Sequence, residues 1–415
     1  MAEVLRAITV NQRGVVRLRR GHVWVYRSDL VPPIEASGGS LVQVRDERGR
    51  CLGSAFYSSA SQIAIRMVAD EDLTETGLSA LLRERIANAV HFRQQVARDT
   101  DSYRVIFSEA DLLPGLIVDK YNDVLSMQAL TQAFDREDLR QIVIEALAEH
   151  FPDCSLVERV DPHIRELEQL PERPSQLVLG ERTSTIFTMN GVKFHFDCLG
   201  GQKTGAFLDQ RENYAAAARY GHGEALDCFT YQGGFALHLA RGCERVTGVD
   251  SSRPALELAE QNEQLNLGEV PRLAQQKGEP GAHRCGEIEW IEANAFDLLK
   301  DYATAQRQYD TIVLDPPAFA KTKRTVPTAL RGYKELNLRA LKMLRPGGIL
   351  VTCSCSFHVS EAEFLGMLGS AAADAGRRVR ILDKRTQSQD HPVLLNVPET
   401  AYLKCIIVRI GSDIA

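Results

Sequence analysis

The sequence predicts a multi-domain protein with an N-terminal β-barrel, a small central α+β domain and a C-terminal Rossmann-like α/β domain. Its 415 residues suffice for two or three domains. Short apolar runs separated by Gly and Ser turns fill the first 70 residues, as in a small barrel. From residue 224 onward, strand-like and helix-like segments alternate, which predicts a doubly wound parallel sheet. We therefore place the domains at residues 1–72, 73–183 and 184–415, the last with a leading β-hairpin.

Composition indicates an ordinary globular protein of a reducing compartment. Hydrophobic residues make up 44% and charged residues 25% of the chain. No apolar run approaches the roughly 18 residues of a membrane span, and the first residues lack the apolar core of a secretory signal. The nine cysteines are scattered without a CxxC pair, which argues against a disulfide framework. We expect a cytoplasmic protein with no membrane partner.

Charge is unevenly distributed along the chain. The net charge is −6 overall, but the first 70 residues carry ten arginines against six acidic residues, a net charge of +4. The remainder therefore carries about −10. A basic module attached to an acidic body is typical of a domain that delivers a polyanion to an active site. An ordinary solvated, arginine-rich face explains the charge equally well.

Six short strands are expected in this basic module: residues 7–10, 15–18, 22–26, 41–44, 51–57 and 63–68. Near the third, Arg19, Arg20 and His22 are interleaved with Trp24 and Tyr26. Cations among aromatic rings suit contacts to phosphates and bases, so we take Arg19, Arg20 and His22 as candidate RNA-binding residues. Trp24 alternates with apolar neighbours, and we favour core packing for its ring.

The central region has the pattern of a small α+β unit. Helices are expected at residues 74–98 and 136–150. Extended segments are expected at residues 103–107, 116–119, 124–130 and 155–159. No residue pattern in this region indicates a catalytic role, so we interpret it as a spacer or a domain that shapes the substrate site.

A hairpin and a glycine-rich segment precede the predicted sheet. Asn190-Gly191 lies between alternating runs, a strong hairpin signal. Residues 200–213, GGQKTGAFLDQREN, follow, but they lack the GxxxxGK[ST] spacing of a phosphate-binding P-loop. The candidates for binding an anionic group in this segment are Lys203, Gln210 and Arg211.

The predicted sheet occupies the last half of the chain. Its strands are expected at residues 224–229, 245–250, 288–291, 311–315, 349–355, 379–382 and 403–408. Helices are expected at residues 235–241, 254–267 and 328–344. A long polar loop spans residues 268–286.

Two of these strands end in chemically active side chains. The run Ile312–Leu314 stops at Asp315, and Pro316 follows, so the chain must leave the sheet there. The next strand ends in the cysteines Cys353 and Cys355. Because open α/β sheets bind ligands at the carboxyl ends of their strands, we expect a carboxylate and a thiol in one crevice.

The first strands of the sheet carry the signature of a nucleoside site. The dinucleotide fingerprint GxGxxG is absent, but a glycine pair follows Asp227, and Asp250 ends the second strand. Asp250 suits ribose hydroxyls and Asn294 suits an adenine edge, which favours S-adenosylmethionine. The candidate cofactor-binding residues are Lys203, Gln210, Arg211, Asp227, Cys228, Phe229, Tyr231, Gly233, Gly234, Asp250, Ser251, Asn294, Ala295, Asp315 and Pro316.

Seven pieces of the last half of the chain form a family pattern: QKTGAFLDQREN, LDCFTYQGGFALHLA, VTGVDSS, DTIVLDPPAFAKTK, RGYKELN, GGILVTCSCS and DHPV. With these pieces, the chain resembles the RlmI-type large-subunit rRNA cytosine methyltransferases of bacteria and archaea. Residues 20–26 and 53–57 look like that family's PUA domain, and residues 103–119 resemble its central domain. The resemblance implies a PUA-like barrel, a class I methyltransferase domain, 23S rRNA as substrate and 5-methylcytidine as product.

The resemblance also implies a mechanism. Carbon 5 of cytosine is a poor nucleophile until a thiolate adds to carbon 6, and Cys355 matches the family's nucleophile. Cys353 stands where the family often has an apolar residue, and we favour a buried packing role for it. Asp315 is the second catalytic candidate, since it can bond the cytosine edge. No His/Cys cluster accompanies the CxC pair, so no metal is expected.

The sequence is also compatible with two other functions. An RNA methyltransferase acting on guanine N7 or N2 would share many of these features but needs no thiol. A non-catalytic, RNA-binding ribosome assembly factor would not need to keep the cofactor residues. For the methyltransferase hypothesis the expected partner is 23S rRNA, naked or in an early large-subunit particle, with a second copy of the chain in a homodimer as a further candidate.

Overall fold

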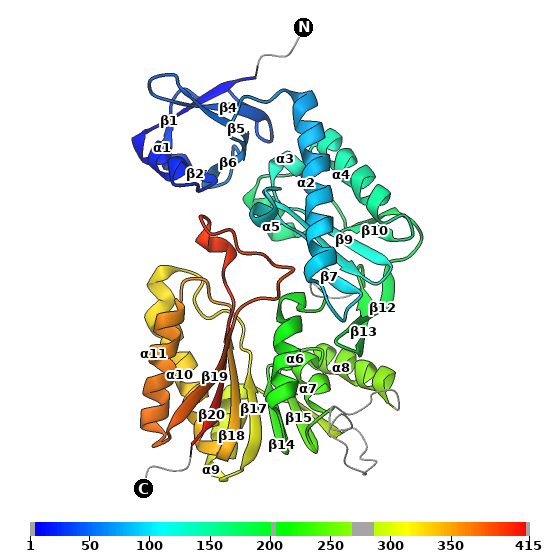
Figure 1. Ribbon diagram of the computed structural model, residues 1–415, viewed down its shortest axis with the longest axis vertical. Coiled ribbons are helices and arrows are strands. Elements are labelled where there is room, and N and C mark those ends of the chain that lie inside the picture. Colours follow the sequence, from blue (N-terminus) through cyan, green and yellow to red (C-terminus); the bar gives the residue numbers. More distant parts are fainter. Residues whose placement is uncertain (1–4, 201–204, 268–285, 412–415) are drawn as a thin grey trace. The chain divides into compact units, whose positions relative to one another are not determined.

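The computed structural model describes residues 5–200, 205–267 and 286–411 (Figure 1). Its contacts divide the chain into two compact units. Unit 1 comprises residues up to Phe187, with Phe196–Gly205 and Gln389–Thr400; unit 2 comprises Thr188–His195, Ala206–Ser388 and the residues from Ala401 onward. Within the described ranges, no helix is both long enough and apolar enough to cross a membrane.

The N-terminal part of unit 1 is the expected β module, a six-stranded sheet in the order β2-β6-β5-β4-β1-β3. Its strands are β1 (Ala7–Val10), β2 (Trp24–Tyr26), β3 (Leu30–Val31), β4 (Leu41–Asp46), β5 (Cys51–Tyr57) and β6 (Ile63–Ala69). Alternate strand residues such as Val42 and Val44 are fully buried in its core. The strand pattern alone therefore located most of this module.

The strand expected at residues 15–18 is wrong, because helix α1 (Gln12–Arg19) occupies that stretch. Asn11 caps this helix: its side-chain oxygen accepts from the Gly14 N–H at 3.1 Å. The consecutive residues Gly14 and Val15 are both buried whereas Val16 is 39% exposed, so burial does not alternate as it does along a strand. The β-branched residues suggested a strand, and the capping residue outweighed them.

The central part of unit 1 is a five-stranded sheet in the order β11-β10-β9-β8-β7, with helices packed against it. The strands are β7 (Ser102–Phe107), β8 (Leu116–Tyr121), β9 (Val124–Ala129), β10 (Ser155–Glu158) and β11 (Gln176–Leu179). The helices are α2 (Glu75–Val96), α3 (Gln132–Asp135), α4 (Glu137–His150) and α5 (Pro162–Leu167). One core joins the two parts of unit 1, since the Phe56 and Phe134 rings lie 5.7 Å apart within it.

A segment from near the end of the chain completes unit 1. Asp390 lies fully buried in it, and its carboxylate accepts from the Arg104 N–H at 2.9 Å. The Asp390 carbonyl oxygen accepts from the Arg93 guanidinium at 2.9 Å, and the His391 ring lies 5.4 Å from that of Phe107. The DHPV piece is thus an anchor for this segment.

Unit 2 contains the expected doubly wound sheet, with seven strands in the order β16-β15-β14-β17-β18-β20-β19. They are β14 (Glu224–Cys228), β15 (Arg245–Asp250), β16 (Glu287–Glu292), β17 (Tyr309–Leu314), β18 (Leu344–Ser354), β19 (Val379–Arg385) and β20 (Lys404–Ile410). The first five run parallel, and β20 is antiparallel to both β18 and β19. The strand order reverses between β14 and β17, where such sheets bind their ligands.

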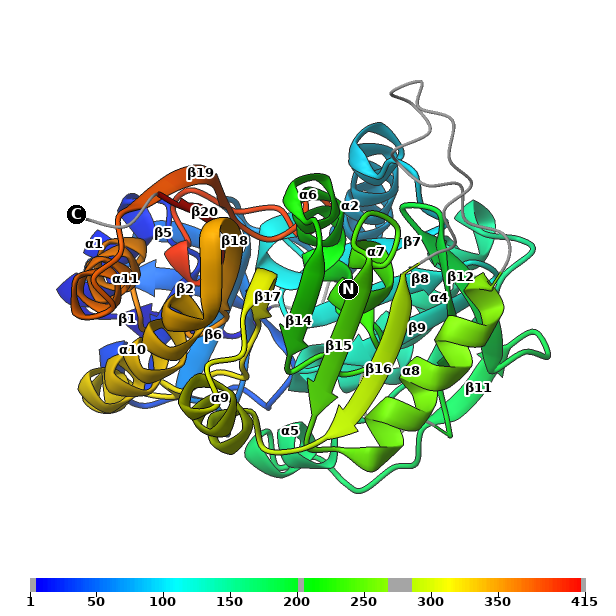
Figure 2. The ribbon, with the colours of Figure 1, turned by 90° about the horizontal axis from the view of Figure 1, so that it is seen from below.

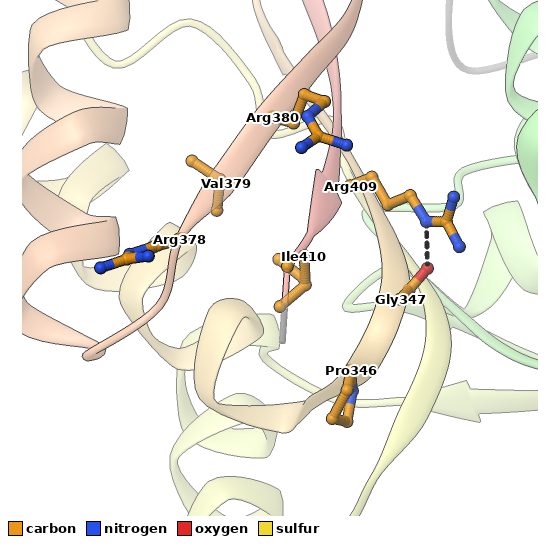
Figure 3. A pocket seen from close by; sticks show the side chains of 8 residues that line it. Pro346, Gly347, Arg378, Val379, Arg380, Arg409 and Ile410 are labelled. Atoms are coloured by element: carbon orange, nitrogen blue, oxygen red, sulfur yellow. Dashed lines mark hydrogen bonds between the residues drawn. The ribbon is translucent and has the colours of Figure 1, made fainter. Parts of the chain in front are cut away.

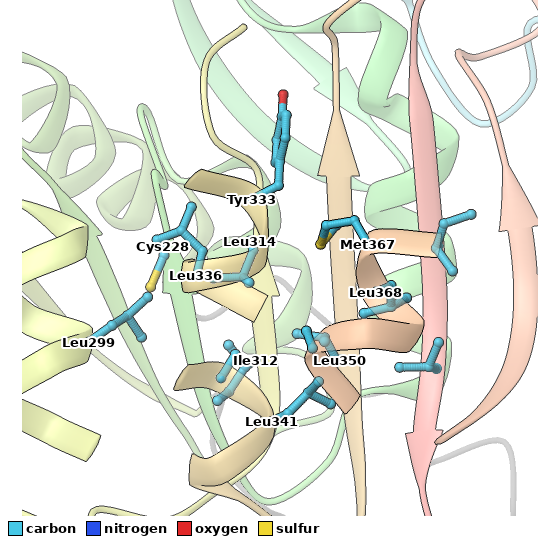
Figure 4. Close-up of a cluster of buried hydrophobic side chains, with 14 of the residues drawn as sticks. Cys228, Leu299, Ile312, Leu314, Tyr333, Leu336, Leu341, Leu350, Met367 and Leu368 are labelled. Atoms are coloured by element: carbon cyan, nitrogen blue, oxygen red, sulfur yellow. The ribbon is translucent and has the colours of Figure 1, made fainter. Parts of the chain in front are cut away.

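Helices cover both faces of this sheet (Figure 2). They are α6 (Arg211–Tyr220), α7 (Gly234–Leu239), α8 (Arg253–Asn266), α9 (Ala295–Thr304), α10 (Val326–Met343) and α11 (Glu361–Asp374). Side chains of α9, α10 and α11 form one core with β14, β17 and β18, including Leu299, Ile312, Leu341 and Leu350 (Figure 4). The expected hairpin forms as β12 (Ser184–Met189) and β13 (Val192–Asp197).

Candidate active site

The carboxyl ends of β17 and β18 bring Asp315 and Cys355 to one place. The two strands pair in parallel, with Leu314 opposite Thr352, so the residues that follow them leave the sheet side by side. The Cys355 Sγ lies 4.0 Å from the carbonyl oxygen of Pro316. Both Asp315 and Cys355 are half-buried. The structure therefore assembles the expected pairing of a carboxyl group and a thiol.

One tyrosine fixes the two serines that flank Cys355. Tyr333 of α10 is fully buried, and its hydroxyl accepts from the Ser354 hydroxyl at 2.9 Å. It also lies 3.0 Å from the Ser356 hydroxyl, which in turn accepts from the Ala320 N–H at 3.1 Å. This network ties the loop after β17 to the loop after β18 and holds Cys355 between two anchored residues.

Tyr333→Phe should lower the rate of catalysis because Cys355 is held less firmly, although Tyr333 takes no part in the reaction itself. Removal of the hydroxyl leaves the buried Ser354 and Ser356 hydroxyls without their shared partner, at a cost of about 1–3 kcal/mol in stability. We expect kcat to fall about 10-fold while cofactor affinity, measured by calorimetric titration, stays unchanged. Tyr302→Phe, on α9, is the control. Equal losses of cofactor affinity and kcat would point to general unfolding instead.

A buried lysine lies beside the nucleophile candidate. Lys404 is 8% exposed, and its Nζ donates to the carbonyl oxygens of Ser356 at 2.7 Å and Val359 at 2.8 Å. Burial lowers the pKa of Lys404 to about 8, and the neighbouring Cys355 opposes that shift. Lys404 thus supports the turn after Cys355 and supplies the positive charge that favours its thiolate.

Burial holds protons on both catalytic candidates. It raises the pKa of Asp315 to about 8, helped by the negative charges of Asp209 and Asp227. It also raises the pKa of the Cys355 thiol to about 11, with further contributions from Asp315 and Asp209. At neutral pH the free site therefore contains a neutral carboxylic acid and a thiol.

A chain of amides orients Asp315. The Gln210 Nε2 donates to Asp315 Oδ2 at 3.0 Å, and Gln210 Oε1 accepts from Asn213 Nδ2 at 2.7 Å. The second bond fixes which end of the Gln210 amide faces the acid. Gln210 therefore contacts Asp315, whereas Arg211 is 1% exposed inside unit 2. Lys203 lies outside the described residues.

The turn after β14 contains three residues with left-handed backbone conformations. Phe229, Tyr231 and Gly233 have φ values of 66°, 53° and 87°. A Cβ on Gly233 would lie 2.8 Å from the Trp290 ring, and one on Gly234 would lie 2.5 Å from the Tyr214 ring. Only glycine fits these two positions.

Two carboxylates hold this turn. Asp227 is fully buried, and its Oδ2 accepts from the Thr230 hydroxyl at 2.6 Å and the Ala236 N–H at 2.9 Å. Asp250 Oδ2 accepts from the Tyr231 N–H at 2.9 Å, and its Oδ1 accepts from the Ser252 N–H at 2.9 Å. These two bonds fix the orientation of the Asp250 side chain at the end of β15, and each of its carboxylate oxygens keeps a further lone pair for a ligand.

The remaining cofactor candidates fall into two groups. The Cys228 side chain packs in the hydrophobic core (Figure 4), which leaves only its backbone for a ligand. Ala295 and Pro316 are also buried. Ser251 and Asn294 are exposed, but the Asn294 side chain already caps α9 by accepting from the Phe296 N–H at 2.9 Å.

In unit 1, the three RNA-binding candidates differ in their surroundings. Arg19 and Arg20 are exposed at the end of α1. The His22 Nδ1 accepts from the Trp24 N–H at 3.1 Å, so its Nε2–H donates to Glu399 at 3.2 Å. Both ring nitrogens of His22 are thus used in hydrogen bonds within unit 1. The Trp24 indole N–H donates to Glu109 at 2.9 Å, so this ring is bound within the unit.

Sequence reasoning missed three contributors to the site: Asp209, Tyr333 and Lys404. The Asp209 carboxylate accepts from the Tyr402 hydroxyl at 2.6 Å. The signal for Lys404 was available, because a lysine interrupts an apolar strand pattern between Leu403 and Cys405. Tyr333 lies in the RGYKELN piece, but no local pattern connects it to Cys355.

Two family models match separate parts of the chain. Residues 8–70 match a family model of PUA-like domains, and residues 169–409 match that of S-adenosylmethionine-dependent methyltransferases. A ribosomal RNA large subunit methyltransferase I from Klebsiella pneumoniae is 36% identical over 401 residues, which cover 95% of each chain. Its counterpart from Citrobacter koseri is 36% identical over 416 residues, covering 98% of this chain and 99% of the relative.

Two solved structures share the fold. A protein from Streptococcus mutans assigned as a SAM-dependent methyltransferase has a TM-score of 0.77 at 17% identity, with 98% of this chain and 100% of that one covered. A methyltransferase in complex with SAH has a TM-score of 0.76 at 18% identity, with the same coverage.

Fold, site and family models together define an S-adenosylmethionine-dependent methyltransferase that carries a PUA-like domain. The relatives at 36% identity over almost the full length narrow this class further. The chain belongs to the ribosomal RNA large subunit methyltransferase I family. The expected fold class, family and cofactor are thereby confirmed.

Proposed function

We propose that this protein methylates carbon 5 of a cytosine in 23S rRNA, with Cys355 as a covalent nucleophile. The observation that carries the proposal is the half-buried Cys355 thiol beside Asp315 at the shared carboxyl ends of β17 and β18. Methylation of a guanine nitrogen needs no thiol there. The names of the curated relatives support large-subunit rRNA as the substrate.

The residues at the first strand ends fit S-adenosylmethionine. Asp227 Oδ1 is buried and has no hydrogen-bond partner in the described ranges, which suits a cationic ligand group nearby. Asp250 suits the ribose hydroxyls, because each of its carboxylate oxygens keeps a lone pair beside the bond it already accepts. Bound S-adenosylmethionine supplies an electrophilic methyl group.

The protein's own residues then serve the covalent step. Cys355 Sγ forms a bond to carbon 6 of the cytosine as its proton passes to water. Ring N3 takes the proton of Asp315, and the C5=C6 double bond shifts to C4=C5. Asp315, with a pKa of about 8, is able both to donate to N3 and to be reprotonated near neutral pH. Lys404 stabilises the thiolate as it forms. After methylation of carbon 5, water takes the carbon-5 proton, the C–H electron pair forms the C5=C6 double bond, and the Sγ–C6 bond breaks to release the thiolate. Ring N3 returns its proton to Asp315, and the thiolate is reprotonated from water, which restores the free site.

The target base must leave its stack to reach this site, because the reacting groups lie at the ends of buried strands. The PUA-like part of unit 1 would bind the RNA backbone around it. Arg13 and Arg17 both pair with the buried Asp29, whereas Arg19 and Arg20 are exposed at the end of the same helix. This difference supports Arg19 and Arg20 as the phosphate-binding pair.

Arg19→Gln together with Arg20→Gln should weaken RNA binding and leave cofactor binding unchanged. Each lost phosphate contact lowers the slope of log K against log salt by about 0.7–0.9. The measurement is a fluorescence titration with 23S rRNA at several salt concentrations. The control is Arg6→Gln with Arg45→Gln, which makes the same charge change at arginines paired with Glu35 and Asp72. Equal effects of the two double variants would contradict the assignment.

The function itself is tested by product analysis. The protein is incubated with S-adenosylmethionine and unmodified 23S rRNA, either naked or in immature large-subunit particles, and the digested nucleosides are identified by mass spectrometry. We expect 5-methylcytidine. A methylated guanosine would replace the proposal with nitrogen methylation, and cofactor-independent RNA binding without any product would favour the assembly-factor function.

A further inference from the structure

An arginine-lined pocket lies on unit 2 at the opposite end of β18 from Cys355. Its volume is about 540 Å³, and its lining comprises Pro346, Gly347, Arg378, Val379, Arg380, Arg409, Ile410 and Gly411 (Figure 3). The lining thus contains three arginines and no acidic residue. This concentration of positive charge contrasts with the net charge of −6 of the whole chain.

Two of these arginines face each other across neighbouring strands. Arg380 of β19 and Arg409 of β20 are direct partners in the antiparallel ladder, and both are exposed. Figure 3 shows their side chains next to each other, whereas the Arg378 guanidinium points the other way. Like charges directly opposite each other on antiparallel strands destabilise a sheet. A bound anion would remove that repulsion.

The local structure presents these guanidinium groups rather than neutralising them. The Arg409 Nε donates to the Gly347 carbonyl oxygen at 3.3 Å, which orients the side chain and leaves its terminal nitrogens available. In the described part of the chain, no carboxylate forms an ion pair with Arg378, Arg380 or Arg409. Strand β19 is the last strand of the sheet, so the pair lies on an open edge.

We propose that Arg380 and Arg409, with Arg378 at the rim, form a second binding site for the phosphodiester backbone of the rRNA substrate. The planar guanidinium fork matches the paired oxygens of a phosphate or a carboxylate, and the proposed rRNA substrate supplies phosphodiester groups. The inference rests on the proposed RNA substrate but not on the cytosine chemistry. From Gly347 to the end of β18 the strand spans about 23 Å, so the site would hold RNA well away from the flipped base.

A simpler role for these charges is protection of the sheet edge against pairing with other chains. The two roles predict different results for RNA binding. Protection of the edge requires charge on β19 but no affinity for RNA. A phosphate site requires that removal of both guanidinium groups weakens binding and reduces its dependence on salt.

The test compares Arg380→Gln/Arg409→Gln with Arg245→Gln/Arg253→Gln in the full-length protein. The control arginines lie on the same unit but pair with Glu287 and with Glu257 and Glu260. Each protein is titrated with unmodified 23S rRNA at four salt concentrations. For the Arg380/Arg409 variant we expect a Kd for RNA roughly three- to ten-fold higher than that of the wild type. The slope of log K against log salt should be lower by about 1.4–1.8, which corresponds to the loss of two phosphate contacts. Melting temperature and S-adenosylmethionine affinity should not fall.

The proposed site would be overturned if the Arg380/Arg409 variant kept the wild-type RNA affinity and salt slope, or if its losses equalled those of the control variant. The role of these arginines would then be protection of the sheet edge or binding of an acidic protein segment. Because binding is measured without turnover, the result is independent of the methylation product. If the wild-type protein bound no rRNA, both this site and the proposed function would fail; if only the variant comparison were negative, the proposed function would stand.

Discussion

Cys355→Ala should reduce the formation of 5-methylcytidine by at least about 10³-fold, the scale of loss when a covalent nucleophile is removed. Without the thiolate, carbon 5 of the cytosine never gains the electron density that methyl transfer requires. Fold and cofactor affinity should persist, because Cys355 is half-buried and its neighbours Ser354 and Ser356 keep their bonds to Tyr333. Tritium transfer from labelled S-adenosylmethionine to 23S rRNA measures the loss.

Cys353→Ala is the matched control for this prediction. Cys353 is fully buried and lies directly opposite Cys405 in the ladder between β18 and β20. Burial raises the pKa of its thiol well above the ordinary value. The variant should therefore retain activity close to that of the wild type.

The covalent intermediate itself can be trapped. A 5-fluorocytidine at the target position cannot lose its carbon-5 substituent as a proton, so the Sγ–C6 bond should persist through denaturing electrophoresis. We expect a protein–RNA band for the wild type and for Cys353→Ala, and none for Cys355→Ala. A band that persisted in Cys355→Ala and vanished in Cys353→Ala would move the nucleophile by two residues.

Asp315→Asn should reduce activity about 10²- to 10⁴-fold, the usual contribution of a general acid. The variant keeps the shape of the side chain but cannot supply a proton to ring N3. The Gln210 amide would face an amide in place of a carboxyl oxygen. S-Adenosylmethionine affinity, measured by calorimetry, should change much less than kcat.

The same substitution should stabilise the protein, and more so at high pH. Burial raises the pKa of Asp315 from the ordinary 3.8 to about 8. A carboxyl whose folded-state pKa lies above its unfolded value favours folding fully below pH 3.8, and this contribution is lost as the pH rises toward 8. Asparagine does not titrate, so the gain in Tm over the wild type should grow from pH 5 to pH 8. About 2–4 °C corresponds to 1 kcal/mol in a domain of this size.

Asp310→Asn is the control at the other end of β17. The Asp310 carboxylate accepts from the Glu224 N–H at 2.9 Å and the Arg345 guanidinium at 2.6 Å, so its loss should lower Tm and leave activity intact. If Tm depended on pH in the same way in Asp315→Asn and in the wild type, the Asp315 carboxyl group would be ionised in the folded protein. Full activity in Asp315→Asn would remove it from the mechanism.

The chain sequence by itself determined where the strands of unit 2 end and which side chains stand there. Proline after Asp315, glycine after Asp227 and the Asn-Gly hairpin are local signals, because each limits the backbone conformations of its own residue. The motifs that resemble the RlmI-type family then indicated that the residues at these strand ends form a methyltransferase site. The strand predicted at residues 15–18 is instead part of helix α1, because the Asn11 cap outweighs the strand preference of the β-branched Val15 and Val16.

Only the tertiary structure decided how these ends work together. Whether Cys353 or Cys355 is accessible depends on the pairing of β18 with β20, and a strand register is set by contacts far apart in sequence. The Tyr333 network, the buried Lys404 and the raised pKa of Asp315 arise from burial by other elements. The opposition of Arg380 and Arg409 likewise exists only in the ladder. Charge, burial and partners are properties of the packed chain, and no local pattern specifies them.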